Sequence, residues 1–596
     1  MSKLFDDSSL AMIPSAVKDG KLYSIRPTDG DGDFTFSRGS NLAATRVDVN
    51  GLIEKGRENQ ILHSNNFSTG WTTNDASLTS GQSGYDGSNN AWKLVGNTNA
   101  SRHNLLQSFS ITGINTLSVY VKASGHNYVQ LASASSIHQY ANFDLSDGSV
   151  GSVGSSFVDA KATSVGNGWY RLSVVNPINT MVSCYISLIS SNTAGWLESW
   201  TMSNSTDGVF LQHFQFEQGL VATDYIETGA STAQAGILED LPRLDYGASC
   251  PSLLLEPQRS NLIGNSEYFG AWNNVTYPVT ITSNSATSPD GNTNAALITP
   301  TSGNSRHATR DTNVAAVSGT TYTLSAFFKK AGSRYVVLGD SGDSLWHLVT
   351  ADLNNGTITD EENATGTIEP YENDWYRVTC TFTRTNAVTI QTFLGASPTD
   401  TNTAAPSFDD TSLTAYIYGF QVEAESYPTS YIPTYGSAVT RSQDLTTADT
   451  SSFYTDSSSG TLFTELSFPL AADGNYNGWF FWNGSGYNRI VLQRRGDSGR
   501  GQIEVRINNT TQASIISSSV ITLEDNHKML VRWDGNVFTF FIDGVNIGSD
   551  TSNDVYSGTD LNELASRPTY NAANIKQILL FPTALTDSEC IALTTL

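Results

Sequence analysis

The chain has 596 residues, and only 15% of them are charged, against about a quarter in an ordinary globular domain. The 32 basic and 57 acidic side chains leave a net charge of −25 at pH 7. A surface of this sign repels phosphate backbones and anionic lipids, so we expect neither nucleic acid nor a membrane as partner. The low charge argues against coiled-coil and disordered proteins and favours many short strands joined by polar turns.

The cysteines and the N-terminus bear on where the protein is made. Cys184, Cys250, Cys380 and Cys590 are too widely spaced for a zinc or redox motif, so we expect free thiols. The first ten residues contain acids and no apolar run of the kind found in secretion signals. We therefore expect synthesis in a cytoplasm, without a signal peptide or a transmembrane segment.

Residues 1–57 are expected to form an N-terminal arm with the first strands. Within it, Asp29, Asp31 and Asp33 alternate with glycines, as in the first half of a calcium loop. The twelfth position of that loop is Ser40 and not Glu, and no flanking helices are expected. Calcium bound by the three aspartates is the one cofactor considered, and a solvated turn is the alternative.

A long internal repeat follows the arm. The phrase Asn59-Gln-Ile-Leu-His-Ser-Asn-Asn-Phe-Ser-Thr-Gly-Trp71 returns as Asn261-Leu-Ile-Gly-Asn-Ser-Glu-Tyr-Phe-Gly-Ala-Trp272. Further matches pair Ser101-Arg-His103 with Ser305-Arg-His307, Trp169-Tyr-Arg171 with Trp375-Tyr-Arg377, and Phe214-Gln-Phe-Glu217 with Phe420-Gln-Val-Glu423. Because the offset stays between 202 and 208 residues, we predict a duplicated domain over residues 58–236 and 237–441.

Each copy is predicted to be all-β. Leu117–Val121 and Leu324–Phe328 are short apolar runs rich in β-branched or aromatic residues. Asp-Gly and Asn-Gly pairs between such runs favour hairpin turns because these residues tolerate positive φ. Strands at this spacing predict tandem β-sandwich or jelly-roll domains rather than βαβ units.

The C-terminal segment, residues 442–596, is also predicted to be all-β but differs from the repeats. Its most regular strands end in Asp-Gly turns, at Lys528-Met-Leu-Val-Arg-Trp-Asp-Gly535 and Phe541-Ile-Asp-Gly544. With Ile578-Leu-Leu-Phe-Pro-Thr-Ala-Leu-Thr-Asp587, these phrases resemble the laminin G-like, concanavalin A-like jelly roll. At Leu579–Pro582 the family usually has a polar residue before the aromatic residue. The sequence here departs from that pattern but remains compatible with the fold.

Other phrases resemble virion proteins of tailed bacteriophages. They are Lys21-Leu-Tyr-Ser-Ile-Arg-Pro-Thr-Asp-Gly-Asp-Gly-Asp33, Pro242-Arg-Leu-Asp-Tyr246, Cys250-Pro-Ser-Leu-Leu-Leu-Glu-Pro-Gln-Arg-Ser-Asn-Leu262 and Tyr431-Ile-Pro-Thr434. The resemblance implies a tail fibre, tail appendage or head decoration located in the virion. It also implies docking to other virion proteins through the N-terminal region, and a homo-oligomer, commonly a trimer.

No catalytic residues are predicted. Ser341 and Ser344 lie in a Gly-Asp-Ser-Gly-Asp-Ser run that resembles esterase and protease nucleophile motifs. A nucleophilic serine needs a base oriented by a carboxylate, and the equivalent stretch of the first repeat lacks the Gly-Asp. The Glu-x-Asp-x-x-Glu run of concanavalin-like glucanases is absent too, although acids from separate strands are left open.

Glycan binding requires aromatic rings that stack on sugars and polar groups that grip hydroxyls. The first candidates are Trp482, Tyr487 and Arg489, around one turn of the C-terminal domain. Trp479 and Trp482 have opposite strand parity, so at most one of them faces the core. The second candidates are the repeated Arg102 with His103 and Arg306 with His307; the alternative for these is a shared fold contact.

Trp169 with Arg171, and Trp375 with Arg377, are expected to be structural, with the tryptophans packed inward. The function expected overall is that of a non-enzymatic phage-particle component that adheres to host or environmental glycans. Two alternatives stay open: a particle-borne polysaccharide depolymerase, and a purely structural decoration without a ligand.

Overall fold

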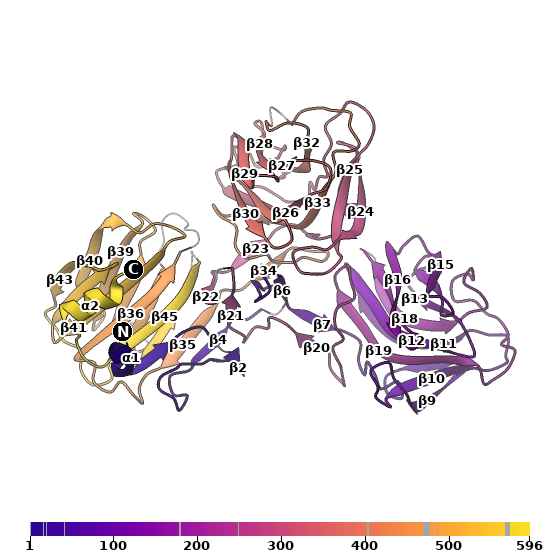
Figure 1. Cartoon of the computed structure of the whole chain (residues 1–596), viewed down its shortest axis with the longest axis horizontal. Helices are drawn as coiled ribbons and strands as arrows, with labels where there is room; N and C mark the ends of the chain where they lie inside the picture. Colours follow the sequence, from indigo (N-terminus) through magenta and orange to yellow (C-terminus); the bar gives the residue numbers. More distant parts are fainter. Residues whose placement is uncertain are drawn as a thin grey trace.

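A computed structural model describes residues 2–15, 17–18, 21–40, 42–177, 180–247, 250–401, 405–468, 477–484, 487–566 and 572–596. The described chain is almost entirely β-strand and forms three lobes around a central junction (Figure 1). The all-β class with two sandwich repeats and a jelly roll is thereby confirmed. None of the described helices has the length and apolar character needed to cross a membrane.

The first repeat is a sandwich of two six-stranded antiparallel sheets, at the right of Figure 1. One sheet runs, in spatial order, β16 (Asp159–Gly166), β17 (Trp169–Asn176), β12 (Asn115–Ser124), β19 (Gly208–Gln218), β10 (Ala91–Gly96) and β9 (Ala76–Gln82). The other runs β15 (Ser149–Val153), β14 (Tyr140–Asp144), β13 (Tyr128–Ala132), β18 (Met181–Leu188), β11 (His103–Ile111) and β8 (Thr72–Asn74). Alternate residues of both sheets, such as Leu117, Val119 and Phe143, fill the core between them.

The second repeat has the same plan with a smaller second sheet. Its six-stranded sheet runs β24 (Val279–Ala286), β25 (Ala295–Pro300), β33 (Ala415–Glu423), β26 (Thr321–Lys330), β31 (Trp375–Thr383) and β30 (Thr365–Tyr371). Its four-stranded sheet runs β29 (Thr357–Glu362), β28 (His347–Asp352), β27 (Tyr335–Asp340) and β32 (Thr392–Ser397), and a short 3-10 helix covers Phe269–Ala271. Both repeats keep the same hydrogen bonds at equivalent asparagines. The side-chain amides of Asn59 and Asn261 donate to the carbonyls of Phe214 and Phe420, each at 3.1 Å.

The third lobe is a jelly roll assembled from three separate stretches of chain. Its eight-stranded sheet contains β1 (Leu10–Met12), β21 (Arg243–Asp245), β22 (Ser252–Leu255), β45 (Ala573–Phe581), β36 (Ser459–Ser467), β41 (Asn526–Asp534), β42 (Val537–Ile542) and β43 (Val545–Thr551). Its nine-stranded sheet runs β2 (Val17–Lys18), β3 (Lys21–Leu22), β4 (Phe34–Ser37), β35 (Leu445–Asp449), β44 (Glu563–Ser566), β37 (Asn477–Trp482), β38 (Arg489–Arg494), β39 (Arg500–Ile507) and β40 (Thr510–Val520). Helices α1 (Ser2–Asp7) and α2 (Asp587–Thr594) accompany the eight-stranded sheet, and their apolar side chains pack on its outer face.

This assembly differs from the expected domain boundaries. The first 37 residues supply strands to both jelly-roll sheets and do not form a separate arm. Strands β21 and β22, expected to open the second repeat, belong to the jelly roll instead: β21 pairs with β22, β22 pairs with β45, and Leu253 and Leu255 enter the jelly-roll core. The two repeats are therefore insertions between strands of one discontinuous jelly roll.

Each inserted repeat is closed at its neck by a two-stranded ribbon. β7 (Arg57–Asn59) pairs with β20 (Ala233–Ala235) below the first repeat, and β23 (Arg259–Asn261) pairs with β34 (Val439–Arg441) below the second. A hairpin of β5 (Thr45–Val47) and β6 (Ile53–Lys55) precedes the first neck. Its Ile53 packs in an apolar cluster on the outer face of the second repeat, beside Phe327 and Trp375.

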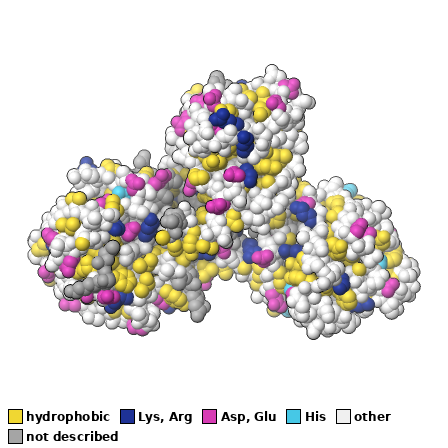
Figure 2. Space-filling view, viewed as in Figure 1, with side chains coloured by type: hydrophobic (Ala, Val, Ile, Leu, Met, Phe, Trp, Pro, Cys, Tyr) yellow, Lys and Arg dark blue, Asp and Glu magenta, His cyan; other side chains and the backbone are white. Residues whose placement is uncertain are grey.

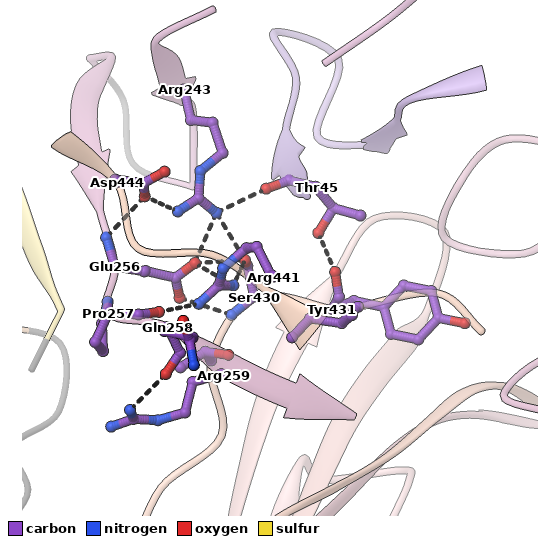
Figure 3. A network of polar contacts seen from close by, with 12 residues as sticks. Thr45, Arg243, Glu256, Pro257, Gln258, Arg259, Ser430, Tyr431, Arg441 and Asp444 are labelled. Carbon is purple, nitrogen blue, oxygen red and sulfur yellow. Dashed lines mark hydrogen bonds and ion pairs between the residues drawn. The ribbon is translucent and has the colours of Figure 1, made fainter. Parts of the chain in front are cut away.

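The segments that connect the jelly roll to the repeats are joined by a buried ionic network (Figure 3). The carboxylate of Glu256 lies 2.6 Å from Arg243 and 2.7 Å from Arg441. Asp444 contacts both Arg243 and Arg38, so that the network ties together four crossing segments of the chain. The necks and the jelly roll thus share one charged core at the junction.

Candidate functional site

His103 and His307 are buried anchors at equivalent positions of the two repeats. The imidazole of His103 lies 2.9 Å from the carbonyl oxygen of Asp75 and 3.1 Å from that of Trp200. His307 bridges the carbonyls of Pro278 and Phe408 in the same way, at 2.7 and 3.0 Å. Both rings are almost fully buried, so their role is the shared fold contact and they offer no nitrogen to a ligand.

The arginines that precede these histidines point to the surface and lie over tryptophan rings. The guanidinium carbon of Arg102 is 5.3 Å from the ring centroid of Trp196, and that of Arg306 is 4.8 Å from Trp346. Trp196 comes from the loop after β18, whereas Trp346 comes from the loop before β28. The repeats therefore build the same arginine–tryptophan pair with tryptophans from different loops.

The loop that carries Trp196 is held by two buried amides of the sheet beneath it. Gln130 of β13 donates to the carbonyl of Gly195 at 3.0 Å and accepts from the backbone amide of Leu197 at 2.8 Å. Asn142 of β14 donates to the carbonyl of Ala194 at 2.8 Å. The indole nitrogen of Trp196 itself donates to Ser133 at 2.9 Å, which fixes the ring plane.

Trp196 is one wall of an open pocket of about 570 Å³ on the first repeat. Tyr140 is another wall, because its neighbours Ala141 and Phe143 fill the core and alternation turns Tyr140 outward. The remaining lining residues are Ile137, His138, Val153, Gly154 and Ser155. Aromatic walls with an arginine beside them make a surface on which a sugar ring can stack.

The second repeat carries a related aromatic cluster on its four-stranded sheet. The ring centroid of Phe393 lies 5.2 Å from that of Tyr277 and 5.8 Å from that of Trp346. Arg310 lies over Tyr277 at 5.3 Å, in addition to Arg306 over Trp346. Both repeats thus present arginines stacked on half-buried aromatic rings.

In the jelly roll, the predicted hairpin is formed by β37 and β38, two neighbouring strands of the nine-stranded sheet. Trp479 faces the core and Trp482 faces away from it, as strand parity predicts. Trp482 is nevertheless mostly buried, with only 9% of the residue exposed, and its indole nitrogen donates to Glu563 at 2.9 Å. Arg489 pairs with Glu504 at 2.8 Å, and Tyr487 alone of the three candidates is largely exposed. Residues 485–486 of the turn lie outside the described residues.

The three aspartates of the predicted calcium loop, Asp29, Asp31 and Asp33, lie between β3 and β4. Asp33 accepts from the backbone amide and hydroxyl of Ser24, and Asp29 accepts from the amide of Asp31, so the three aspartates do not converge. Across the part of the chain that the structure describes, no three His, Cys, Asp or Glu side chains gather as metal ligands would. Asp29, Asp31 and Asp33 therefore do not form such a group.

The Gly-Asp-Ser run of the second repeat is organised by buried polar contacts. Asp340 pairs with Arg384, and Asp343 accepts from the backbone amide of Thr385 at 2.8 Å. His347 lies 3.3 Å from Asp343 and its other ring nitrogen contacts a carbonyl, that of Asn363. Both ring nitrogens of His347 are thus engaged away from Ser341 and Ser344.

In the repeated Trp-Tyr-Arg phrase, the tryptophan and the arginine point to the outer face of a six-stranded sheet, that of β17 in the first repeat and that of β31 in the second. Trp169 is buried there in a cluster with Tyr85 and Tyr120. Trp375 is buried in a cluster with Ile53 of the β5–β6 hairpin. Arg171 donates to the hydroxyl of Ser118 at 3.0 Å, and Arg377 donates equivalently to Ser325. The expected structural role fits these contacts, but the direction expected for the tryptophans differs, since Tyr170 and Tyr376 take the inward positions.

Sequence reasoning identified Arg102 and Arg306 but missed Arg310 and the aromatic residues Trp196, Tyr140, Trp346 and Tyr277. These residues lie outside the matched phrases, because each repeat uses a different loop. The one available signal was their type, since tryptophans in polar loops are unusual unless they pack or bind.

Comparisons with known proteins add little to this geometry. No protein-family model matches the chain. No curated protein matches it either. A carbohydrate-binding module of a Ruminococcus gnavus sialidase, bound to α2,3-sialyllactose, matches 23% of this chain and 83% of its own, at 14% identity and a TM-score of 0.21.

Two further solved structures match at the same level. Domain 4 of an extracellular arabinanase of Geobacillus stearothermophilus, in complex with arabinotriose, matches 26% of this chain and 73% of its own, at 13% identity and a TM-score of 0.22. The binding domain of botulinum neurotoxin serotype G matches 25% of this chain and 39% of its own, at 15% identity and a TM-score of 0.21. Likeness at this level says nothing about what the present chain binds.

Proposed function

We propose that this protein is a non-enzymatic component of a tailed-phage particle and that it binds glycans through its inserted repeats. The observation that carries the proposal is the open pocket of about 570 Å³ beside Tyr140 and Trp196. Arg102 stands next to it, over the indole of Trp196. Such a combination provides apolar ring faces together with hydrogen-bond donors, which is what a pyranose requires.

The jelly roll takes a different part in this proposal from the one its sequence suggested. Its hairpin tryptophan is mostly covered and bonded to Glu563, and Arg489 is paired with Glu504, which also pairs with Arg506. The jelly roll acts as the frame from which both repeats project (Figure 1). Assignment to a phage particle is supported by the phrases shared with phage virion proteins, and docking to other particle proteins goes with it.

Binding of the full chain to purified polysaccharides on a biosensor tests the proposal. We expect Trp196→Ala and Tyr140→Ala each to weaken binding about tenfold, because each variant removes a stacking surface. Tyr487→Ala is the matched control: it removes an exposed aromatic of the jelly roll and should leave binding unchanged. Unchanged binding by both repeat variants would overturn the assignment to this pocket.

A reducing-sugar assay on the same polysaccharides tests the non-enzymatic part. We expect no release of oligosaccharides over hours at micromolar protein. Steady release would replace the proposal with a depolymerase.

A further inference from the structure

The arginines of this acidic protein are mostly neutralised by carboxylates. Examples are Arg46 with Glu54 at 2.7 Å, Arg334 with Asp352 at 2.6 Å and Arg489 with Glu504 at 2.8 Å. On the face seen in Figure 2, acidic and basic side chains are scattered over all three lobes. Some arginines have no carboxylate partner: Arg171 and Arg377, for example, donate to serine hydroxyls instead.

Arg102 and Arg310 are two such arginines, and both lie on the binding faces described above. Among the described residues, no carboxylate oxygen comes within 4.0 Å of either guanidinium. Arg102 stacks on Trp196 in the first repeat and Arg310 stacks on Tyr277 in the second.

Stacking leaves the edge of each guanidinium available to a ligand. The N–H donors lie in the plane of the group, so a ring below it does not use them. Placed beside an aromatic wall, this edge has the fork geometry that binds a carboxylate or sulfate group through two hydrogen bonds. A neutral sugar offers this fork no anionic partner.

We infer that the ligand of the repeats is an acidic polysaccharide, whose anionic groups are bound by Arg102 in the first repeat and by Arg310 in the second. The inference rests on the proposed glycan binding and deepens it by naming the class of sugar. Two sites in one chain add avidity for a polymer that reaches both.

Binding of the full chain to defined probes tests the inference. The anionic probes are polygalacturonate and polysialic acid, which carry carboxylates, and chondroitin sulfate, which also carries sulfate; dextran and arabinan are the neutral probes. We expect binding to at least one anionic probe, weakened about tenfold or more by Arg102→Gln or Arg310→Gln. We also expect binding to weaken as salt is raised, because exposed ion pairs are screened.

Arg334→Gln is the matched control. Arg334 also lies over an aromatic ring, that of Tyr335 at 4.9 Å, but it is paired with Asp352. We expect this variant to bind like the wild type. Equal loss in all three variants would overturn the inference by showing a general charge effect.

Glycan binding and the acidic class of the ligand are distinguished by these probes and variants. Binding to dextran or arabinan that is lost in Trp196→Ala but unaffected by the arginine variants would overturn the acidic ligand and leave glycan binding intact. Absence of binding to every anionic and neutral probe would count against both.

Discussion

Lys55 and Asp290 lie 2.7 Å apart, although Lys55 belongs to the hairpin before the first repeat and Asp290 belongs to the second repeat. Lys55 also lies 2.9 Å from Glu267, so one cation from the hairpin serves two carboxylates of the inserted domain. At the equivalent place in the first repeat, Gln212 donates to Asp86 at 3.1 Å and no lysine is present. The hairpin thus supplies the cation for the carboxylates of the second repeat, whereas in the first repeat the equivalent carboxylate is bonded by a residue of the same repeat.

Replacing Lys55 with Met should therefore destabilise the second repeat strongly. The variant leaves Glu267 and Asp290 buried without their cation, which costs about 3–5 kcal/mol. The measurement is calorimetric unfolding of the full chain, in which the transition of the second repeat should move to lower temperature. Lys161→Met removes a more exposed pair with Asp159 and should cost less than about 1 kcal/mol. A cost for Lys55→Met as small as that of Lys161→Met would contradict the role given to Lys55.

The same pair predicts a pH dependence. Burial alone would raise the pKa of Asp290, but Lys55 lowers that pKa from 3.8 to about 2. A carboxyl whose pKa is lower in the folded state stabilises the fold above its unfolded pKa, and this stabilisation is lost as the pH falls through the folded pKa. The difference in unfolding free energy between wild type and Lys55→Met should therefore shrink between about pH 4 and pH 2. A difference that stays constant over this range would exclude the coupling.

Glu256 should be indispensable to the junction. Burial alone would raise its pKa, but Arg441 and Arg243 hold the pKa of this carboxyl well below its ordinary value. Glu256→Gln leaves these two buried arginines with less compensating charge, which costs about 3 kcal/mol or more. We expect limited proteolysis to cut between the jelly roll and the second repeat sooner than in the wild type.

Glu54 provides the control for this variant. Glu54 and Arg46 form an ion pair within the β5–β6 hairpin, but their side chains are 34% and 22% exposed. Glu54→Gln should cost about 0.5 kcal/mol and leave the proteolysis pattern unchanged. Indistinguishable digestion of the two variants would rule out a special role for the buried network.

Glycine is predicted to be required at position 419 because of its backbone conformation. Its φ is +59°, and a Cβ there would lie 3.0 Å from a ring carbon of Phe327. Gly419→Ala should therefore cost about 1–2 kcal/mol in denaturant unfolding. Gly229→Ala is the control, because this position has no positive φ and no atom within 4 Å of the added Cβ, so its effect should stay within about 0.5 kcal/mol. The first repeat has His213 at the position of Gly419, with φ +55°, so the bend itself is shared.

Much of the fold follows from local sequence patterns. The duplication is visible because residues such as Asn59 and Asn261 make identical backbone bonds, which keeps their phrases alike. Strand parity predicted that at most one of Trp479 and Trp482 faces the core, and the structure shows that Trp479 is the inward one. Burial of His103 and His307 was one of two alternatives, and the contacts decide for it.

The discontinuous jelly roll could not be predicted in this way. Two of its strands, Arg243–Asp245 and Ser252–Leu255, are too short to stand out in the sequence. Ser252–Leu255 pairs with β45, which lies more than 300 residues further along the chain. Likewise, nothing local in Ile53 or Lys55 indicates that both pack on the second repeat rather than the first. The pocket of the first repeat was missed for the same reason, since Trp196 and Tyr140 come together only through the loop held by Gln130.

Hydrogen–deuterium exchange of the full chain, with and without a saturating polysaccharide that binds it, tests the central claim most directly. Glycan binding through the first repeat predicts slower exchange in residues 133–155 and 189–200, with residues 487–507 of the jelly roll unchanged. Slower exchange confined to residues 487–507, with the first repeat unchanged, would contradict the account.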